Sequence, residues 1–287
     1  AKPAGSACRN IHPGTGQGLK TMCLAAIALN VHPEFPFICV ANRDEFHNRP
    51  TAPLYAWDNG LFAGKDLQSG GAWLGVGKNG EFALLTNVRN AALNMPTTAP
   101  TRGELVVNSV LHGKGPTEHA ALGYAGFNLI HGSLIQAALQ CTSNQGLKLD
   151  KAQPYSIPLN KGIHSLSNGH LGAPWPKTRR LETGLQGRLS ALNAGATAIR
   201  ELESDLFDLL AHTGHADDSE LPNTGVPYEW EKMLSAVKIV SPLYGTRSSA
   251  VILLDCSNTA HFTEITFDPA GNEIGRQRFE IPLPPKL

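Results

Sequence analysis

Cys23 is the residue of this chain with the most evident chemistry. It directly follows Met22 and begins the apolar run Cys-Leu-Ala-Ala-Ile-Ala-Leu, which is typical of a buried strand. If Met22 is the initiating residue and is removed, Cys23 gains a free α-amine with an unperturbed pKa of about 8, next to a thiol with a pKa of about 8.5. A terminal cysteine therefore holds a nucleophile and a base in one residue, and it can attack a carbonyl without a distant histidine.

Residues 1–21 decide whether Cys23 is terminal. This segment is rich in Gly, Pro and basic residues, and it has neither the apolar block of a signal peptide nor the periodicity of a strand or helix. We expect it to be upstream translated sequence; the alternative is a disordered N-terminal extension that keeps Cys23 internal. Residues 22–287 are expected to form a single domain, because no linker interrupts their pattern.

The composition is that of an ordinary soluble globular protein, with 41% hydrophobic and 17% charged residues and a formal net charge of zero. This charge gives no reason to expect a nucleic-acid partner, and no apolar run approaches the roughly 20 residues of a membrane span. The histidines show no metal signature, so we expect no metal site. None of the five cysteines has CxxC spacing, so neither a zinc site nor a disulfide framework is indicated. Reduced thiols and a cytoplasmic location are the simpler account. The five are Cys8, Cys23, Cys39, Cys141 and Cys256.

Blocks of strands alternate with blocks of helices along the chain. Between Cys23 and Asn90 the pattern favours an antiparallel meander, with Asn79-Gly80 as a strong hairpin signal. Gly132-Ser133 is predicted to be a second two-residue hairpin turn. The order of the blocks predicts an α+β fold, a four-layer αββα sandwich of two antiparallel sheets with helices outside. Strands are expected at 36–41, 72–76, 82–86, 127–131, 134–139, 248–254, 261–267 and 275–281, and helices at 102–123 (broken by Gly113 and Pro116), 175–193 and 197–212.

Five short motifs together resemble one protein family. They are Cys after Met, Asn42-Arg43-Asp44-Glu45, Gly70-Gly71-Ala72-Trp73-Leu74-Gly75, Leu85-Thr86-Asn87 and Thr246-Arg247-Ser248-Ser249. The chain from Met22 to near its C-terminus resembles the NRDE family, also called the Transport and Golgi organisation protein 2 family. More remotely, it is similar to the cysteine N-terminal-nucleophile hydrolases, such as bile salt hydrolases and penicillin V acylases. That resemblance also implies an αββα sandwich.

The hydrolase resemblance implies roles for six residues. Cys23 matches the nucleophile, Arg43 with Asp44 matches the pair that supports it, and Asn87 and Asn168 match the oxyanion donors. Arg247 matches a final arginine near the nucleophile. If Cys23 is terminal, a nearby cation, Arg43 or Arg247, is expected to lower the pKa of its thiol. We also expect Asn42, Glu45 and Trp73, which belong to the same motifs, to bind substrate. The hydrolases space their Arg and Asp three residues apart, whereas here they are adjacent, so the sequence leaves open which one faces Cys23.

Each of these residues also has a purely structural interpretation. Cys23 can be a small buried hydrophobic residue on a core strand. Arg43, Asp44 and Glu45 can form an ion-pair cluster on the surface at a strand end. Asn87 and Asn168 can be turn formers.

Two functions follow from these alternatives. The first is a cysteine amidohydrolase or thioester hydrolase that acts on a small molecule and requires no cofactor. The second is a protein without turnover that handles haem or acyl-CoA and lipids, for instance an intracellular haem chaperone, because the NRDE family has been linked to those ligands. The chain has no CxxCH motif, so any haem would be bound non-covalently.

Overall fold

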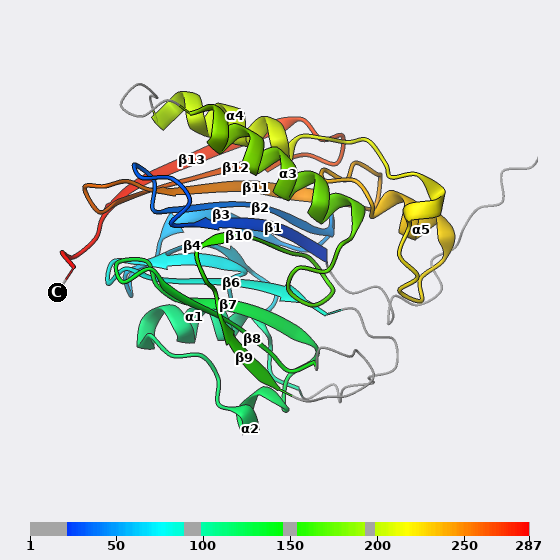
Figure 1. Ribbon diagram of the computed structural model, residues 1–287. Coiled ribbons are helices and arrows are strands. Elements are labelled where there is room, and N and C mark those ends of the chain that lie inside the picture. The colour runs from blue at the N-terminus through cyan, green and yellow to red at the C-terminus, as the bar shows by residue number, and fades with distance from the viewer. Residues whose placement is uncertain (1–21, 89–98, 146–153, 193–198, 287) are drawn as a thin grey trace, which may run out of the picture.

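Two antiparallel β-sheets form the centre of the fold (Figure 1). The structure is a computed structural model that describes residues 22–88, 99–145, 154–192 and 199–286. The six-stranded sheet has the order β10 (Gly162–Leu166), β1 (Met22–Leu29), β2 (Phe37–Phe46), β11 (Tyr244–Leu254), β12 (Thr259–Phe267) and β13 (Glu273–Pro282). The seven-stranded sheet has the order β3 (Thr51–Ala56), β4 (Leu61–Asp66), β5 (Leu74–Gly77), β6 (Glu81–Asn87), β7 (Phe127–Ser133), β8 (Ala138–Ser143) and β9 (Tyr155–Pro158).

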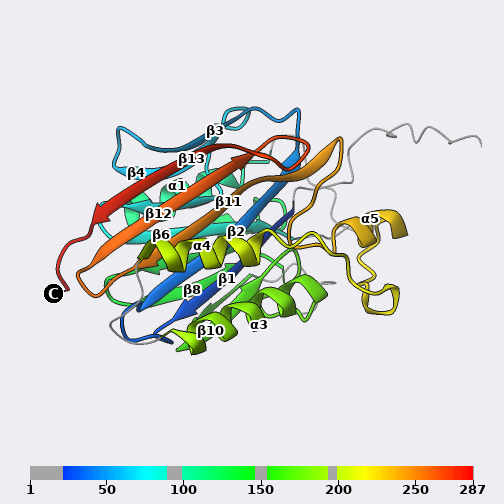
Figure 2. The same ribbon diagram turned by 90° about the horizontal axis from the view of Figure 1, so that it is seen from above.

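Helices cover the outer face of each sheet. α3 (Pro176–Ala191) and α4 (Ile199–Leu210) lie across the six-stranded sheet, as the view from above shows (Figure 2). α1 (Gly103–His112) packs on β5, β6 and β7 of the other sheet. The shorter helices are α2 (Glu118–Ala121), α5 (Tyr228–Met233) and a 3-10 turn at Asp218–Glu220. The predicted four-layer αββα arrangement is therefore confirmed.

β1 is apolar along its length because both of its faces are covered. Ala25 and Ile27 belong to the core between the two sheets, whereas Leu24 and Ala26 belong to the core under α3 and α4. Successive strand residues point to opposite faces, so one strand supplies both cores. This alternation fixes the direction of the Cys23 side chain, which points to the same face as those of Ala25 and Ile27.

The expected meander between Cys23 and Asn90 is divided between the sheets. β1 pairs with β2 in the six-stranded sheet, whereas β3 to β6 pair in sequence in the other sheet. The chain thus changes sheet in the turn between Phe46 and Thr51. The Asn79-Gly80 hairpin is confirmed: Gly80 has φ +82°, and the Asn79 side chain accepts a hydrogen bond from the Glu81 amide at 3.1 Å.

The turn predicted at Gly132-Ser133 is wrong. Both residues belong to β7, and the connection to β8 is made by residues 134–137 instead. Leu134 is 2% exposed and packs into the core between the sheets. The connection therefore includes Leu134 and is longer than a two-residue turn. Ala137 then takes a φ of +50°, within the left-handed region.

No helix among the described residues has the length and apolar character needed to span a bilayer.

Candidate active site at the start of β1

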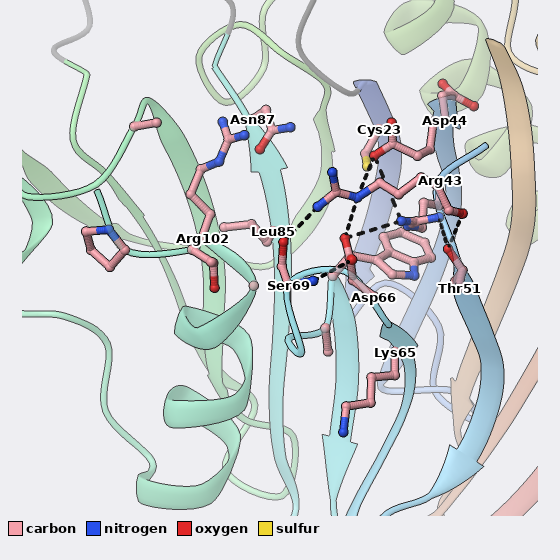
Figure 3. A pocket seen from close by; sticks show the side chains of 18 of the residues that line it. Cys23, Arg43, Asp44, Thr51, Lys65, Asp66, Ser69, Leu85, Asn87 and Arg102 are labelled. Carbon is pink, nitrogen blue, oxygen red and sulfur yellow. Dashed lines mark hydrogen bonds and ion pairs between the residues drawn. The ribbon is translucent and has the colours of Figure 1, made fainter. Parts of the chain in front are cut away.

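A cavity of about 290 Å³ opens where β1 begins, and it contains much of the predicted site (Figure 3). It lies between the two sheets, with β1 and β2 on one side and the ends of β4 and β6 on the other. Three of the predicted site residues, Asn42, Asn168 and Arg247, are not part of the lining. The other predicted residues line the cavity, and they are Cys23, Arg43, Asp44, Glu45, Trp73 and Asn87.

Arg43 shares the face of the sheet on which Cys23 lies. The two residues are direct cross-strand partners between β1 and β2, and such partners point to the same side. The Cys23 side chain is 7% exposed and Arg43 is 6% exposed. The question left open by the adjacent Arg and Asp is thereby answered, because Arg43 rather than Asp44 directs its side chain to the face of Cys23.

The lowering of the thiol pKa was expected for a terminal Cys23 and stays a prediction for that form, whereas in the chain in which Met22 precedes Cys23 the thiol pKa is raised. The pKa of Cys23 is raised to about 12, chiefly by burial and next by the nearby Asp44 carboxylate. The Arg43 guanidinium and a backbone hydrogen bond from Asp44 lower it, but they do not compensate for the loss of water. At neutral pH the thiol is therefore protonated and needs a base.

The Asp44 carboxylate lies on the opposite side of β2, towards the helices. Its Oδ1 accepts a hydrogen bond from the Thr246 hydroxyl at 2.6 Å, while Oδ2 has no hydrogen-bond partner among the described residues. Burial raises the pKa of Asp44 to about 7, although the ammonium of Lys177 at the start of α3 acts to lower it. Asp44 is therefore a buried group with a pKa of about 7, and its carboxylate lies on the face of β2 opposite to Cys23.

Two arginines of the cavity are held by two carboxylates. Arg49 Nε donates to Asp66 Oδ2 at 2.7 Å, and its Nη2 donates to Ser69 at 2.8 Å. Arg43 donates to the Thr51 hydroxyl at 3.2 Å and lies 3.8 Å from Asp66 and 3.9 Å from Glu45. The expected surface ion pairs are thus a buried network, which fixes the guanidinium of Arg43 beside Cys23.

Asn87 and Asn168 are joined at the same end of the molecule. Asn168 Nδ2 donates to the Asn87 carbonyl at 2.7 Å, and the neighbouring Ser167 hydroxyl donates to the Cys23 carbonyl at 2.9 Å. Thr86 donates to the Ser167 carbonyl at 2.7 Å. From outside the cavity, Asn168 therefore supports the position of Asn87 and Ser167 supports that of Cys23, while Asn87 itself lines the cavity.

Arg247 and Asn42 hold the surrounding structure together. Arg247 lies at a bulge of β11 and donates to the carbonyls of Phe46 and Arg49 at 3.0 and 3.1 Å, which braces the turn that carries Arg49. The expected substrate contact by Asn42 is not supported, because its side chain points towards the helices. Its amide donates to the carbonyls of Leu210 and Val237 at 3.0 and 2.8 Å.

Several lining residues were not predicted from the sequence. They include Arg49, which lies in the turn after β2, Asp66, which is the last residue of β4, and Arg102, which directly precedes α1. Arg49 lies only four residues beyond Glu45, so a charged cluster continuing past the NRDE motif was a detectable signal. Arg102 had no comparable signal, because it lies in a different part of the chain and of the fold.

The described residues contain no cluster of three or more His, Cys, Asp or Glu side chains suited to a metal ion. The thiols of Cys23, Cys39, Cys141 and Cys256 are free. Cys256 is exposed in the turn after β11.

Comparison with known proteins places the chain among relatives of similar length. Residues 22–269 match the family described as Transport and Golgi organisation 2. The chain is 32% identical to the Transport and Golgi organization protein 2 homolog of Bos taurus, over 91% of this chain and 99% of that protein. It is also 32% identical to the Homo sapiens homolog, over 85% and 92% of the two chains. Identity to the Drosophila melanogaster protein is 27%, over 87% and 95%.

Two solved structures have a distantly similar fold. One is a Caenorhabditis elegans orthologue of N-acylethanolamine-hydrolyzing acid amidase, with a TM-score of 0.44 and 12% identity over 80% of this chain and 92% of that one. The other is a mutant of a conjugated bile acid hydrolase from Clostridium perfringens, with a TM-score of 0.48 and 9% identity over 91% and 92%. These likenesses are too distant to assign chemistry. The match over residues 22–269 and the identity to the bovine and human proteins show that this chain belongs to the Transport and Golgi organisation 2 family.

Proposed function

We propose that the protein is a cysteine hydrolase that cleaves an amide or thioester bond of a small molecule, with Cys23 as nucleophile once it is the first residue of the chain. The observation that carries this proposal is the position of Cys23 at the start of β1, on the wall of a cavity that it shares with Arg43 and Asn87. The family match, which begins at Met22, supports a functional unit that starts at this point.

The high pKa of the internal thiol explains why a free α-amine matters. With Met22 attached, the thiol is protonated at neutral pH and no histidine is among the described lining residues to act as its base. Removal of Met22 would place an amine on Cys23 itself, with an unperturbed pKa of about 8. A base of that pKa, attached to the nucleophile, is suited to proton transfer near neutral pH.

The proposed reaction proceeds in two halves. The α-amine takes the thiol proton as Sγ forms a bond to the substrate carbonyl carbon, and the carbonyl electron pair moves to oxygen. Collapse of this intermediate expels the amine or thiol leaving group, which receives the proton from the α-ammonium. Water then adds to the resulting thioester, the C–S bond breaks, and the carboxylic acid leaves while the thiol regains its proton.

The side chain of Asn87 is the proposed hydrogen-bond donor to the oxygen of the intermediate. It lines the cavity with Cys23, and its backbone is fixed by the bond from Asn168. Loss of one such donor typically lowers a rate by about 100- to 1,000-fold. Asn168 is proposed to act through Asn87, as a positioning residue.

The second candidate is a protein that binds the same ligand without turnover. The raised pKa of Cys23 favours it, since a protonated buried thiol is inert. Haem in particular does not fit the described lining, which contains several charged side chains and, of the usual axial ligands, only the protonated thiol of Cys23. A small polar ligand with an acyl group is therefore the better candidate cargo.

The decisive experiment combines the native N-terminus with the reactivity of Cys23. Intact mass and N-terminal sequencing of the native protein are expected to show a chain that begins at Cys23. Hydrolysis of a panel of short acyl thioesters and acyl amides should then be lost in Cys23→Ala and reduced to a trace in Cys23→Ser. Cys256→Ala, which removes an exposed thiol outside the cavity, is the matched control and should retain full activity. A native chain that begins before Cys23, or activity that survives in Cys23→Ala, would overturn the hydrolase and leave the binding protein.

A further inference from the structure

The charges that line the cavity are not evenly compensated. Arg43 and Arg49 are engaged by Glu45 and Asp66, as described above. Lys65 directs its ammonium away from Cys23 (Figure 3). This ammonium lies over the ring of Trp57, at 4.6 Å from the centroid. The remaining cation of the described lining is Arg102.

Arg102 is half-buried, yet no carboxylate of the described residues forms an ion pair with it. Its Nη1 donates to the carbonyl of Gly126 at 3.1 Å, which is a neutral acceptor. Glu104, the nearest acidic residue in sequence, instead accepts a hydrogen bond from the Tyr124 hydroxyl at 2.5 Å. Burial lowers the pKa of Arg102 to about 10, so the guanidinium is still charged at neutral pH. The Glu45 carboxylate attracts Arg102 without forming an ion pair with it, because Glu45 is engaged by Arg43 and Arg49. A charge that has lost water without a paired carboxylate is costly unless a ligand supplies one.

Arg102 is the N-cap residue of α1. The residue that follows it is held by the loop before β5, where the Ala72 amide donates to the Gly103 carbonyl at 3.2 Å. The start of the ten-residue helix α1 also carries partial positive charge towards the cavity. In Figure 3 the Arg102 side chain rises from this helix end towards the end of β6, where Asn87 lies.

We propose that Arg102 binds an anionic group, a carboxylate or a phosphate, carried by the small molecule whose acyl carbon is presented to Cys23. The planar guanidinium is suited to two parallel hydrogen bonds with either group. The inference rests on the proposed function in taking this cavity as the substrate site. It adds that the substrate is an anion, and that Arg102 selects it.

Two alkylating reagents of almost the same size test this assignment. In the full-length chain, the rate of alkylation of Cys23 is measured with iodoacetate and with iodoacetamide by mass spectrometry of the peptide that contains Cys23. Both reagents attack the same thiolate, so the ratio of their rates does not depend on the thiol pKa. Arg102→Gln is expected to lower the iodoacetate-to-iodoacetamide ratio by roughly tenfold, as expected for the loss of one nearby charge in a partly hydrated site. Arg102→Lys should preserve most of the ratio.

Arg188→Gln is the matched control, because Arg188 is exposed on α3 and outside the cavity. Its ratio should equal that of the unmodified chain. Protection of Cys23 from iodoacetamide by butyrate or by inorganic phosphate then shows which anion the site prefers, and this protection should disappear in Arg102→Gln. An unchanged ratio in Arg102→Gln, an equal fall in Arg188→Gln, or the absence of protection by both anions would overturn the assignment.

The failure of either proposal can be recognised separately. The alkylation ratio requires no turnover, so a lowered ratio in Arg102→Gln without any hydrolysis supports an anion-binding protein and sinks the hydrolase. Hydrolysis that depends on Cys23, with a ratio insensitive to Arg102, supports the hydrolase and sinks the anion site.

Discussion

Gly71→Ala should destabilise the protein because the backbone of α1 lies directly against this residue. A Cβ added to Gly71 would stand 2.5 Å from the Gly103 carbonyl carbon and 2.7 Å from its Cα. Both are backbone atoms, so the contact can be relieved only by moving the start of α1. Overpacking of this kind typically costs about 1–3 kcal/mol. Weakening of the Ala72 to Gly103 hydrogen bond would add about 1 kcal/mol, for a total of about 2–4 kcal/mol.

Denaturation by guanidinium chloride measures this loss. With a slope of about 4 kcal/mol per M, the midpoint should fall by roughly 0.5–1 M. Gly187→Ala is the control, because Gly187 is an exposed residue of α3 with no atom within 4 Å of its added Cβ. That exchange should raise stability by up to about 1 kcal/mol, since Ala is favoured over Gly in a helix. If the midpoint of Gly71→Ala stays within error of the unmodified chain, the close contact between Gly71 and Gly103 does not exist.

Three further predictions address separate features of the molecule. Asn42→Ala removes donors to two buried carbonyls and should cost at least about 2 kcal/mol in denaturation, but should leave the alkylation ratio at Cys23 unchanged; a changed ratio would return Asn42 to the site. Burial raises the pKa of Glu264 from 4.5 to about 7, so its stabilising contribution is present below about pH 4.5 and is lost as the pH rises through 7. Between pH 5 and pH 8 the unmodified chain should therefore lose about 1–3 kcal/mol relative to Glu264→Gln, and an equal difference at both pH values would contradict the shift. Iodoacetamide at neutral pH should label the exposed Cys256 before Cys39 and Cys141, which are 0% exposed and whose pKa values are raised by burial; mass spectrometry of the three peptides gives the order.

The parts of the fold that the sequence predicted are those with strong local signals. β1 was evident because apolar residues occupy both of its faces, and the hairpin at Asn79-Gly80 because its turn chemistry is specific. Four strands were missed, namely β3, β4, β9 and β10. Only Leu54 of β3 is buried, β9 has no buried residue, and the first half of β10 is partly exposed, so these three strands at sheet edges have no clear apolar pattern. β4 has only the short apolar run Leu61-Phe62-Ala63, which is followed by Gly64-Lys65-Asp66.

The candidate site was predicted in part, because its members come from distant segments. The family resemblance predicted that Cys23, Arg43 and Asn87 lie together. The face of the sheet to which Arg43 points depends on the register of β1 against β2, which no local sequence pattern specifies. The raised thiol pKa of the chain that keeps Met22 was not predicted, for a related reason. The charged residues near Cys23 can be identified from the sequence. The loss of water around the thiol, which has a larger effect on its pKa than Arg43 has, depends on the packing of the fold.

Because the NRDE residues alternate between the two faces of β2, substitutions in this motif should have two different effects, loss of function on one face and loss of stability on the other. Arg43 and Glu45 line the cavity, while Asn42 and the carboxylate of Asp44 bind on the helix side. Exchanges within the motif should therefore produce phenotypes that repeat every second residue. Variants at the cavity positions should accumulate in cells as folded but inert protein, and variants at Asn42 should be lost to degradation, or be active only at low temperature.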